Sequence, residues 1–235
     1  MPVEFQGAAY RFGHSMVRPS YRANLAGDNA GPFFAMIFDA AGEGQADPVD
    51  LRGGCRAARR FIGWQTFFDF GDGNVRPNKK IDTKISTPLF DLPLGAIATH
   101  DQPQVLAQRN FLRQLTWSLP SGQNVARTMR LPVLTDEELG TDLDEYRSGS
   151  YDFKTSTPLW YYVLKEAEVK ADGLRLGPVG GRIVAEVLVG LIRSDPGSYL
   201  APQPRWTPTL TSAGANFGMT DFLTFAGVDP ASRGQ

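Results

Sequence analysis

The chain has 235 residues, with 24 Lys plus Arg, 25 Asp plus Glu and a formal net charge of −1. This balance provides no general field for a phosphate backbone or an anionic membrane, so we expect no nucleic-acid partner. One cysteine and two histidines exclude a disulfide framework and a multi-cysteine zinc site. Any imidazole chemistry must therefore use His14 or His100.

No targeting or membrane segment is predicted. The N-terminal residues lack the basic start and apolar run that are typical of a signal peptide. The most apolar stretch, Ile183–Ile192, contains Glu186 and is much shorter than the ~20 apolar residues that a membrane span needs. The single cysteine favours the cytoplasm, and a secreted location stays open if an upstream signal peptide is missing.

The spacing of apolar residues predicts a mainly α fold, a multi-helix single domain over residues 1–235 with long irregular loops. Residues 20–50 hold several glycines and are predicted to form a loop around the short apolar run Phe33–Phe38. Gly180–Ser194 is the most apolar predicted helix, and we expect it to be the most buried. In chain order, the predicted helices span Val3–Val17, about Leu51–Phe68, Pro103–Leu115, Pro120–Leu131, Thr157–Val169, Gly180–Ser194 and Met219–Phe225.

His14 lies in an informative sequence context, A-A-Y-R-F-G-H-S-M-V-R-P over residues 8–19. A histidine on an aromatic and apolar helix is, by itself, more often a packed residue than a ligand. This string, however, closely resembles the proximal-histidine helix of animal-type haem peroxidases. The resemblance implies that His14 is the axial ligand of haem iron. Neutral imidazole suits that iron, and Gly13 removes a side chain where the flat macrocycle approaches.

A second segment, L-A-Q-R-N-F-L-R over residues 106–113, resembles another landmark of the same family. The resemblance implies that the carbonyl of Asn110 accepts the other ring N–H of the proximal histidine and that Arg113 lies near a haem propionate. Arg11 is a further candidate for the propionates or the proximal face. Asn110 and Arg113 are three positions apart, so a helix places them on one face.

The resemblance extends to Thr157–Tyr162 and Leu176–Glu186, which look like late helices of bacterial members of the family. The sequence departs from the family in two respects. The family's common basic run is replaced by Arg113–Ser118. The half of the domain that carries the family's distal histidine and arginine, upstream of the proximal helix, is absent together with the calcium site. His100 resembles no distal motif. The chain therefore resembles the C-terminal, proximal part of a haem peroxidase domain, with a missing N-terminal half as a candidate partner.

The resemblance implies an oxidoreductase that uses hydrogen peroxide to oxidise a small-molecule electron donor, and the missing distal residues leave the activity of this chain alone open. One alternative is a fatty-acid dioxygenase related to cyclooxygenases. Such enzymes carry a radical-forming Tyr three residues before the proximal histidine, where this chain has Arg11, and Tyr10 is one position too early. The other alternative is a non-catalytic helical protein without stable haem.

Overall fold

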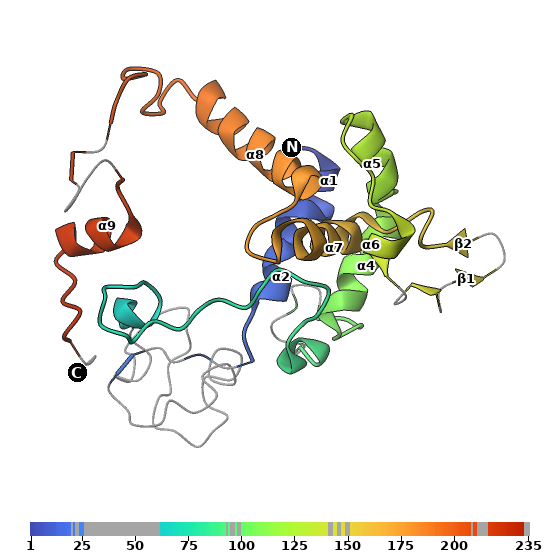
Figure 1. The fold of residues 1–235 in the computed structure, drawn as a ribbon, viewed down its shortest axis with the longest axis horizontal. Coiled ribbons are helices and arrows are strands. Elements are labelled where there is room, and N and C mark those ends of the chain that lie inside the picture. The colour runs from blue at the N-terminus through green and yellow to red at the C-terminus, as the bar shows by residue number, and fades with distance from the viewer. Residues whose placement is uncertain are drawn as a thin grey trace. The chain divides into compact units, whose positions relative to one another are not determined.

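A computed structural model describes residues 1–19, 21, 24–25, 62–92, 94, 97, 100–140, 143–144, 147–148, 151–207, 209–210 and 216–232. This part of the chain is mainly helical, which confirms the predicted fold class (Figure 1). The predicted loop over 20–50 and the first part of the predicted helix Leu51–Phe68 lie almost entirely outside the described residues. The chain divides into two compact units, Met1–Val17 with Lys79–Pro204 and Arg18–Asn78 with Arg205–Gln235.

The first unit holds most of the described helices. It also contains one short antiparallel strand pair, β1 (Arg147–Ser148) and β2 (Tyr151–Asp152), in which Arg147 lies opposite Asp152. The helical segments of this unit are α1 (Val3–Gly7), the 3-10 helix η1 (Ala9–Phe12), α2 (Gly13–Met16), the 3-10 helix η4 (Thr87–Phe90), α4 (Leu106–Thr116), α5 (Gly122–Thr128), α6 (Asp136–Leu139), α7 (Leu159–Ala171) and α8 (Pro178–Ser194).

The N-terminal segment is not the single helix that the periodicity of Val3–Val17 predicts. It is divided into α1, η1 and α2. The first break lies at Ala8, whose dihedrals (φ −134°, ψ −70°) are not helical. A Cβ on the preceding Gly7 would lie 2.9 Å from Cδ1 of Leu119, so the backbone approaches the core closely here. Tertiary packing therefore overrides the helical periodicity of the sequence.

Helix α7 forms the centre of the first unit (Figure 1). It packs against η1, α4, α5, α6 and α8. Its fully buried Tyr162 also fixes a loop, since the hydroxyl accepts a hydrogen bond from the backbone N–H of Leu134. A Cβ on Gly122 would lie 2.0 Å from Cγ of Tyr162, which shows how closely α5 approaches α7. The buried hydrophobic residues of α7 are Leu159, Trp160, Tyr162, Val163, Leu164 and Ala167.

Helix α8 corrects the expectation that Gly180–Ser194 is the most buried helix. Only its first turns are buried, at Val179, Gly180 and Ile183. Beyond them, large apolar side chains are 40–53% exposed, and this set comprises Leu188, Val189, Leu191 and Ile192. Apolar composition predicted the helix correctly but not its burial, because α7 covers only one end of it.

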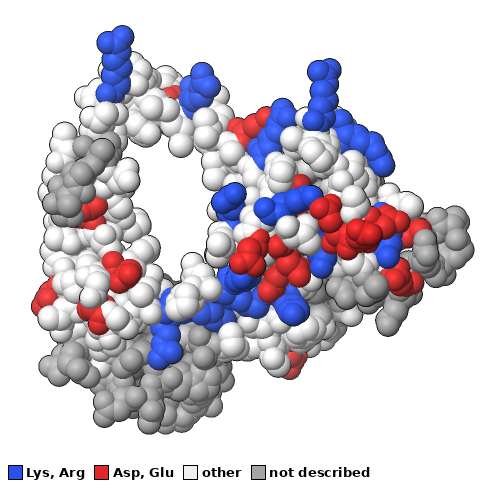
Figure 2. Space-filling model, in the orientation of Figure 1, with Lys and Arg blue, Asp and Glu red and all other residues white. Residues whose placement is uncertain are grey.

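Opposite charges lie close together on the surface of the first unit. On the face shown in Figure 2, acidic and basic side chains are interspersed over its helices. Lys170 pairs with Glu138 on α6, and Arg182 pairs with Glu186 one turn later on α8. Such exposed pairs contribute little stability individually. No helix in the described ranges is long and apolar enough to cross a membrane.

The second unit contains less regular structure. Within the predicted helix Leu51–Phe68, the described residues form only a 3-10 turn, η3 (Trp64–Thr66), so that prediction is wrong there. The predicted helix Met219–Phe225 is confirmed as α9 (Met219–Phe225). The buried side chain of Gln65 connects the two segments of this unit, since its Nε2 donates to the carbonyl of Ser232.

Candidate functional site

His14 lies in α2, a single helical turn that the surrounding structure holds in place. Nε1 of Trp160, on α7, donates to the carbonyl oxygen of Arg11 at 3.2 Å. Oγ of the buried Ser15 accepts from the backbone N–H of Asp82 at 3.3 Å. The imidazole is therefore carried on a segment that is anchored on both sides.

The imidazole of His14 is half-buried, and its environment favours the neutral form. Burial, together with the positive charges of Arg11 and Arg113, lowers its pKa to about 4, although the hydrogen bond with Asn110 opposes this shift. At neutral pH the ring therefore carries no proton charge and has a lone pair available on one nitrogen. This is the protonation state in which histidine binds metals.

Asn110 is the residue that α4 buries. Its side chain is 1% exposed, whereas Leu112 and Leu115 on the same helix are 45% and 75% exposed. The apolar pattern of this segment predicts the opposite arrangement, with leucines inside. A helix that buries an amide and exposes its leucines needs a hydrogen-bonding reason, because a buried polar group is costly without partners.

The partners of Asn110 are His14 and Arg113. Nδ2 of Asn110 lies 2.9 Å from Nδ1 of His14, and Nη1 of Arg113 donates to Oδ1 of Asn110 at 3.0 Å. The structure thus brings together three of the residues that the sequence singles out. It differs from the expectation in one respect, since the amide nitrogen rather than the carbonyl faces the imidazole. The physical reason is that Arg113 can only donate and therefore takes the amide oxygen.

The arginines around His14 form a partly buried cationic group. Burial lowers the pKa of Arg113, as do the nearby charges of Arg11 and Arg109, and burial also lowers the pKa of Arg11. Arg109 has an ion pair with Asp101 at 3.3 Å. Within the described ranges, no acidic side chain pairs with Arg11 or Arg113, and their hydrogen bonds go to neutral oxygens. This arrangement favours an anion beside the imidazole.

Gly13 leaves free space next to His14. A Cβ built at this position would meet no atom within 4 Å. Its dihedrals, φ −57° and ψ −21°, are those of an ordinary helical residue, so the backbone does not require glycine. The backbone at Gly13, one position before His14, therefore borders open space.

His100 is not part of this arrangement. It is exposed in the loop before α4, and its Nδ1 lies 3.1 Å from the carbonyl oxygen of Leu94. Across the described residues, no three His, Cys, Asp or Glu side chains come together as a metal-binding group. A haem site does not need such a group, since the porphyrin supplies the remaining nitrogen ligands and the protein supplies an axial one.

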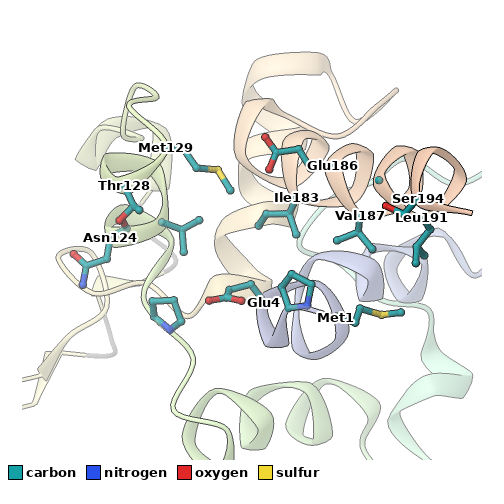
Figure 3. Close-up of a pocket in the computed structure, with 14 residues that line it drawn as sticks. Met1, Glu4, Asn124, Thr128, Met129, Ile183, Glu186, Val187, Leu191 and Ser194 are labelled. Atoms are coloured by element: carbon teal, nitrogen blue, oxygen red, sulfur yellow. The ribbon is translucent and has the colours of Figure 1, made fainter.

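A separate pocket of about 580 Å³ lies between α1, α5 and α8 (Figure 3). Its lining is largely apolar, with Ile183 and Val187 on one side and Met129 on another, and none of the predicted site residues lines it. Sequence analysis missed this pocket because its lining comes from three distant segments. The hydrogen bonds that hold the His14 segment, from Trp160 to Arg11 and from Asp82 to Ser15, also join distant parts of the chain. No sequence signal marks Trp160 or Ser15 for this role.

Comparisons with known proteins assign no family. No protein-family model matches the sequence, and comparison with curated proteins and with solved structures found no match. The resemblance to haem peroxidases therefore stays an expectation that rests on the sequence motifs alone.

Proposed function

We propose that this chain binds haem with His14 as the axial ligand and acts as a peroxidase-type oxidoreductase. The proposal rests on the environment of the His14 imidazole. His14 is neutral, its Nδ1 contacts a buried amide, and its Nε2 has no hydrogen-bond partner among the described residues. A histidine that merely fills space would not be expected to have its own buried asparagine.

The residues around His14 fit a haem. Arg11 and Arg113 lack acidic partners in the described part of the chain, and the carboxylates of a porphyrin are suitable anions for them. Gly13 leaves room for the macrocycle beside the ring. When bound, haem supplies the redox chemistry of peroxide reduction. The protein contributes an oriented neutral imidazole, two cations and a buried amide that fixes the ring.

Peroxide cleavage also requires a base on the opposite face of a haem. Of the two histidines, His14 is assigned to the iron and His100 is hydrogen-bonded in an exposed loop. The proposal therefore assigns this chain the proximal role, with hydrogen peroxide and a small-molecule electron donor as the substrates of the complete site.

Position 11 supports a peroxidase over a dioxygenase. The residue three positions before His14 is Arg11, which cannot form a tyrosyl radical. The neighbouring Tyr10 is 57% exposed and stacks on Phe5, with ring centroids 4.8 Å apart. In the 3-10 helix η1, one position along the chain separates the direction of Tyr10 from that of Arg11 by roughly 120°.

Haem titration followed by absorption spectroscopy tests the proposal. We expect the full chain and His14→Ala to differ, since only the former has an axial imidazole to give a defined Soret band. His100→Ala is the matched control, because it removes the other histidine and should leave the band unchanged. Added free imidazole should restore the band of His14→Ala. Equal spectra for the full chain and His14→Ala, or no retained haem in either, would overturn the assignment.

A peroxide-dependent donor-oxidation assay on the reconstituted chain tests the activity separately. Donor oxidation that exceeds free haem and is lost in His14→Ala supports a working enzyme. Haem binding without such activity would restrict the chain to the binding role.

A further inference from the structure

The side-chain amide of Asn110 lies between His14 and Arg113, and its oxygen can accept a hydrogen bond from either of them. Arg113 has only N–H donors, so the atom of Asn110 that faces it must be Oδ1. The opposite end of the amide, Nδ2, then faces Nδ1 of His14 at 2.9 Å. The orientation of the amide therefore follows from the chemistry of arginine.

This orientation determines which nitrogen of His14 carries the proton. An amide N–H donates to Nδ1, so Nδ1 must be the accepting nitrogen, and the proton of the neutral ring lies on Nε2. Nε2 is the ring nitrogen that has no hydrogen-bond partner among the described residues. In this state, Nε2 of His14 has no lone pair for a metal.

The opposite tautomer needs the opposite orientation of the amide. With the proton on Nδ1, Oδ1 of Asn110 must turn toward the ring and leave Arg113. Because Asn110 is 1% exposed, water cannot readily replace either partner. Arg113 retains a second acceptor, the carbonyl of Arg109 at 3.1 Å, and can take a carboxylate in place of the amide oxygen.

We infer that Arg113 is a positioning residue that controls the tautomer of His14 through Asn110. When a carboxylate of an incoming ligand engages Arg113, Oδ1 is released and the amide turns. The proton on Nε2 then leaves for solvent, Nδ1 takes up a proton from solvent, and the new Nδ1–H donates a hydrogen bond to Oδ1. Nε2 is left with its lone pair. The net proton count is unchanged. The metal-binding consequence rests on the proposed function, whereas the tautomer of the ligand-free chain does not.

Nitrogen NMR of the side chain of His14 in the full, haem-free chain at pH 8 tests this inference. We expect the Nε2–H tautomer in the unmodified chain. Arg113→Met removes the donor that holds Oδ1. A charged hydrogen bond contributes about 1.5–3 kcal/mol, so its loss should change the tautomer ratio by roughly tenfold or more toward Nδ1–H. Arg113→Lys retains a donor and should keep Nε2–H. Arg109→Met removes a neighbouring charge without touching the amide and should also keep it.

Asn110→Asp provides a second test that leaves Arg113 in place. A carboxylate can accept from Arg113 and from Nδ1–H together, so this variant should move the proton to Nδ1. An Nδ1–H tautomer in the unmodified chain, or Nε2–H in both Arg113→Met and Asn110→Asp, would overturn the inference. If the tautomers behave as expected and haem does not bind, the proposed function fails and this inference stands.

Discussion

At the scale of single residues, two glycines show opposite reasons for lacking a side chain. Gly122 packs against the ring of Tyr162, and its Cβ would lie 2.0 Å from Cγ of that ring. Gly13, next to His14, has ordinary helical dihedrals and open space around its missing Cβ. Packing explains Gly122. Nothing in the described protein requires Gly13, whereas under the proposed function its missing side chain would leave room for the haem.

Substitution at Gly13 should therefore separate haem binding from folding. Gly13→Ala should stabilise the haem-free chain by about 0.5–1 kcal/mol, because alanine loses less backbone entropy in a helix. Gly13→Leu should weaken haem binding by roughly tenfold or more, in line with the usual cost of overpacking. Urea unfolding of the haem-free chain and haem titration measure the two effects.

Gly122→Ala is the matched control for Gly13. It should destabilise the fold by about 1–3 kcal/mol or more, since the ring of Tyr162 stands where the new methyl group would lie. Unchanged haem affinity in Gly13→Leu would contradict the assignment of the open space to a ligand.

At the scale of elements, one carboxylate joins the two helices α7 and α8. Glu166 is 1% exposed on α7, and its oxygens accept from the backbone N–H groups of Val179 and Gly180 at 2.9–3.2 Å. These donors belong to the first turn of α8, where a helix has unsatisfied N–H groups and favours a negative charge. A side chain from one helix thus caps the start of the next.

Glu166 should make stability depend on pH. Burial raises its pKa, while the N–H groups of Val179 and Gly180 oppose that shift. The folded chain then holds the proton of Glu166 more tightly than the unfolded chain does. The contribution of Glu166 to stability is therefore fully present below pH 4.5 and is lost as pH rises through the raised pKa. In urea unfolding series between pH 4.5 and 7, the free energy of unfolding of Glu166→Gln should fall less than that of the unmodified chain. An equal fall in the two proteins would contradict this prediction.

Glu166→Ala separates the cap from the titration. Its loss of the acceptor should cost about 1–3 kcal/mol, because buried N–H groups remain unsatisfied. That cost should appear in unfolding measurements throughout the same pH range.

The elements that the sequence predicts well are those whose local signals agree with their packing. Met219–Phe225 matches α9 in both bounds, and Pro103–Leu115 differs from α4 by a few residues. Val3–Val17 fails because the core interrupts it at Ala8. Apolar spacing also predicts the wrong buried face for α4. The residue that this helix buries is Asn110, because its side chain makes hydrogen bonds there.

The residues of the candidate site could be found from sequence only through a resemblance. His14, Asn110 and Arg113 are unremarkable by composition or period, and a motif resemblance alone brings them together. The hydrogen bonds of the structure join the same three residues, but the sequence could not predict which end of the Asn110 amide faces His14. It depends on the presence of Arg113 within 3.0 Å of Oδ1, which is a property of the folded structure.

At the scale of the whole molecule, the described residues include many large apolar side chains at the surface. In the first unit they gather on the outer part of α8 and on α4. Scattered exposed apolar residues are normal, but clusters of this kind attract other apolar surfaces. Leu188 and Val189, 43% and 49% exposed, do not line the pocket beside α8 and are suited to a test.

The double variant Leu188→Gln, Val189→Gln should lower the binding of an apolar fluorescent dye and reduce self-association. Its unfolding free energy should change by no more than about 0.5 kcal/mol per site, because exposed residues contribute little to the fold. Dye fluorescence, sedimentation and urea unfolding measure these outcomes. Ile183→Gln, at a position that is 5% exposed, should instead cost about 3 kcal/mol. Equal losses in both variants would show that the outer part of α8 is buried in solution.

The contact between His14 and Asn110 joins positions that are 96 residues apart, and the hydrogen bond from Trp160 to Arg11 spans 149. Closing loops of this length costs chain entropy before any local contact repays it. Non-local contacts of this kind also form slowly during folding. The imidazole therefore acquires its neighbours only when the long-range packing of the first unit is complete. Loss of this geometry on heating or in denaturant should coincide with the loss of that packing, rather than precede it as local fraying.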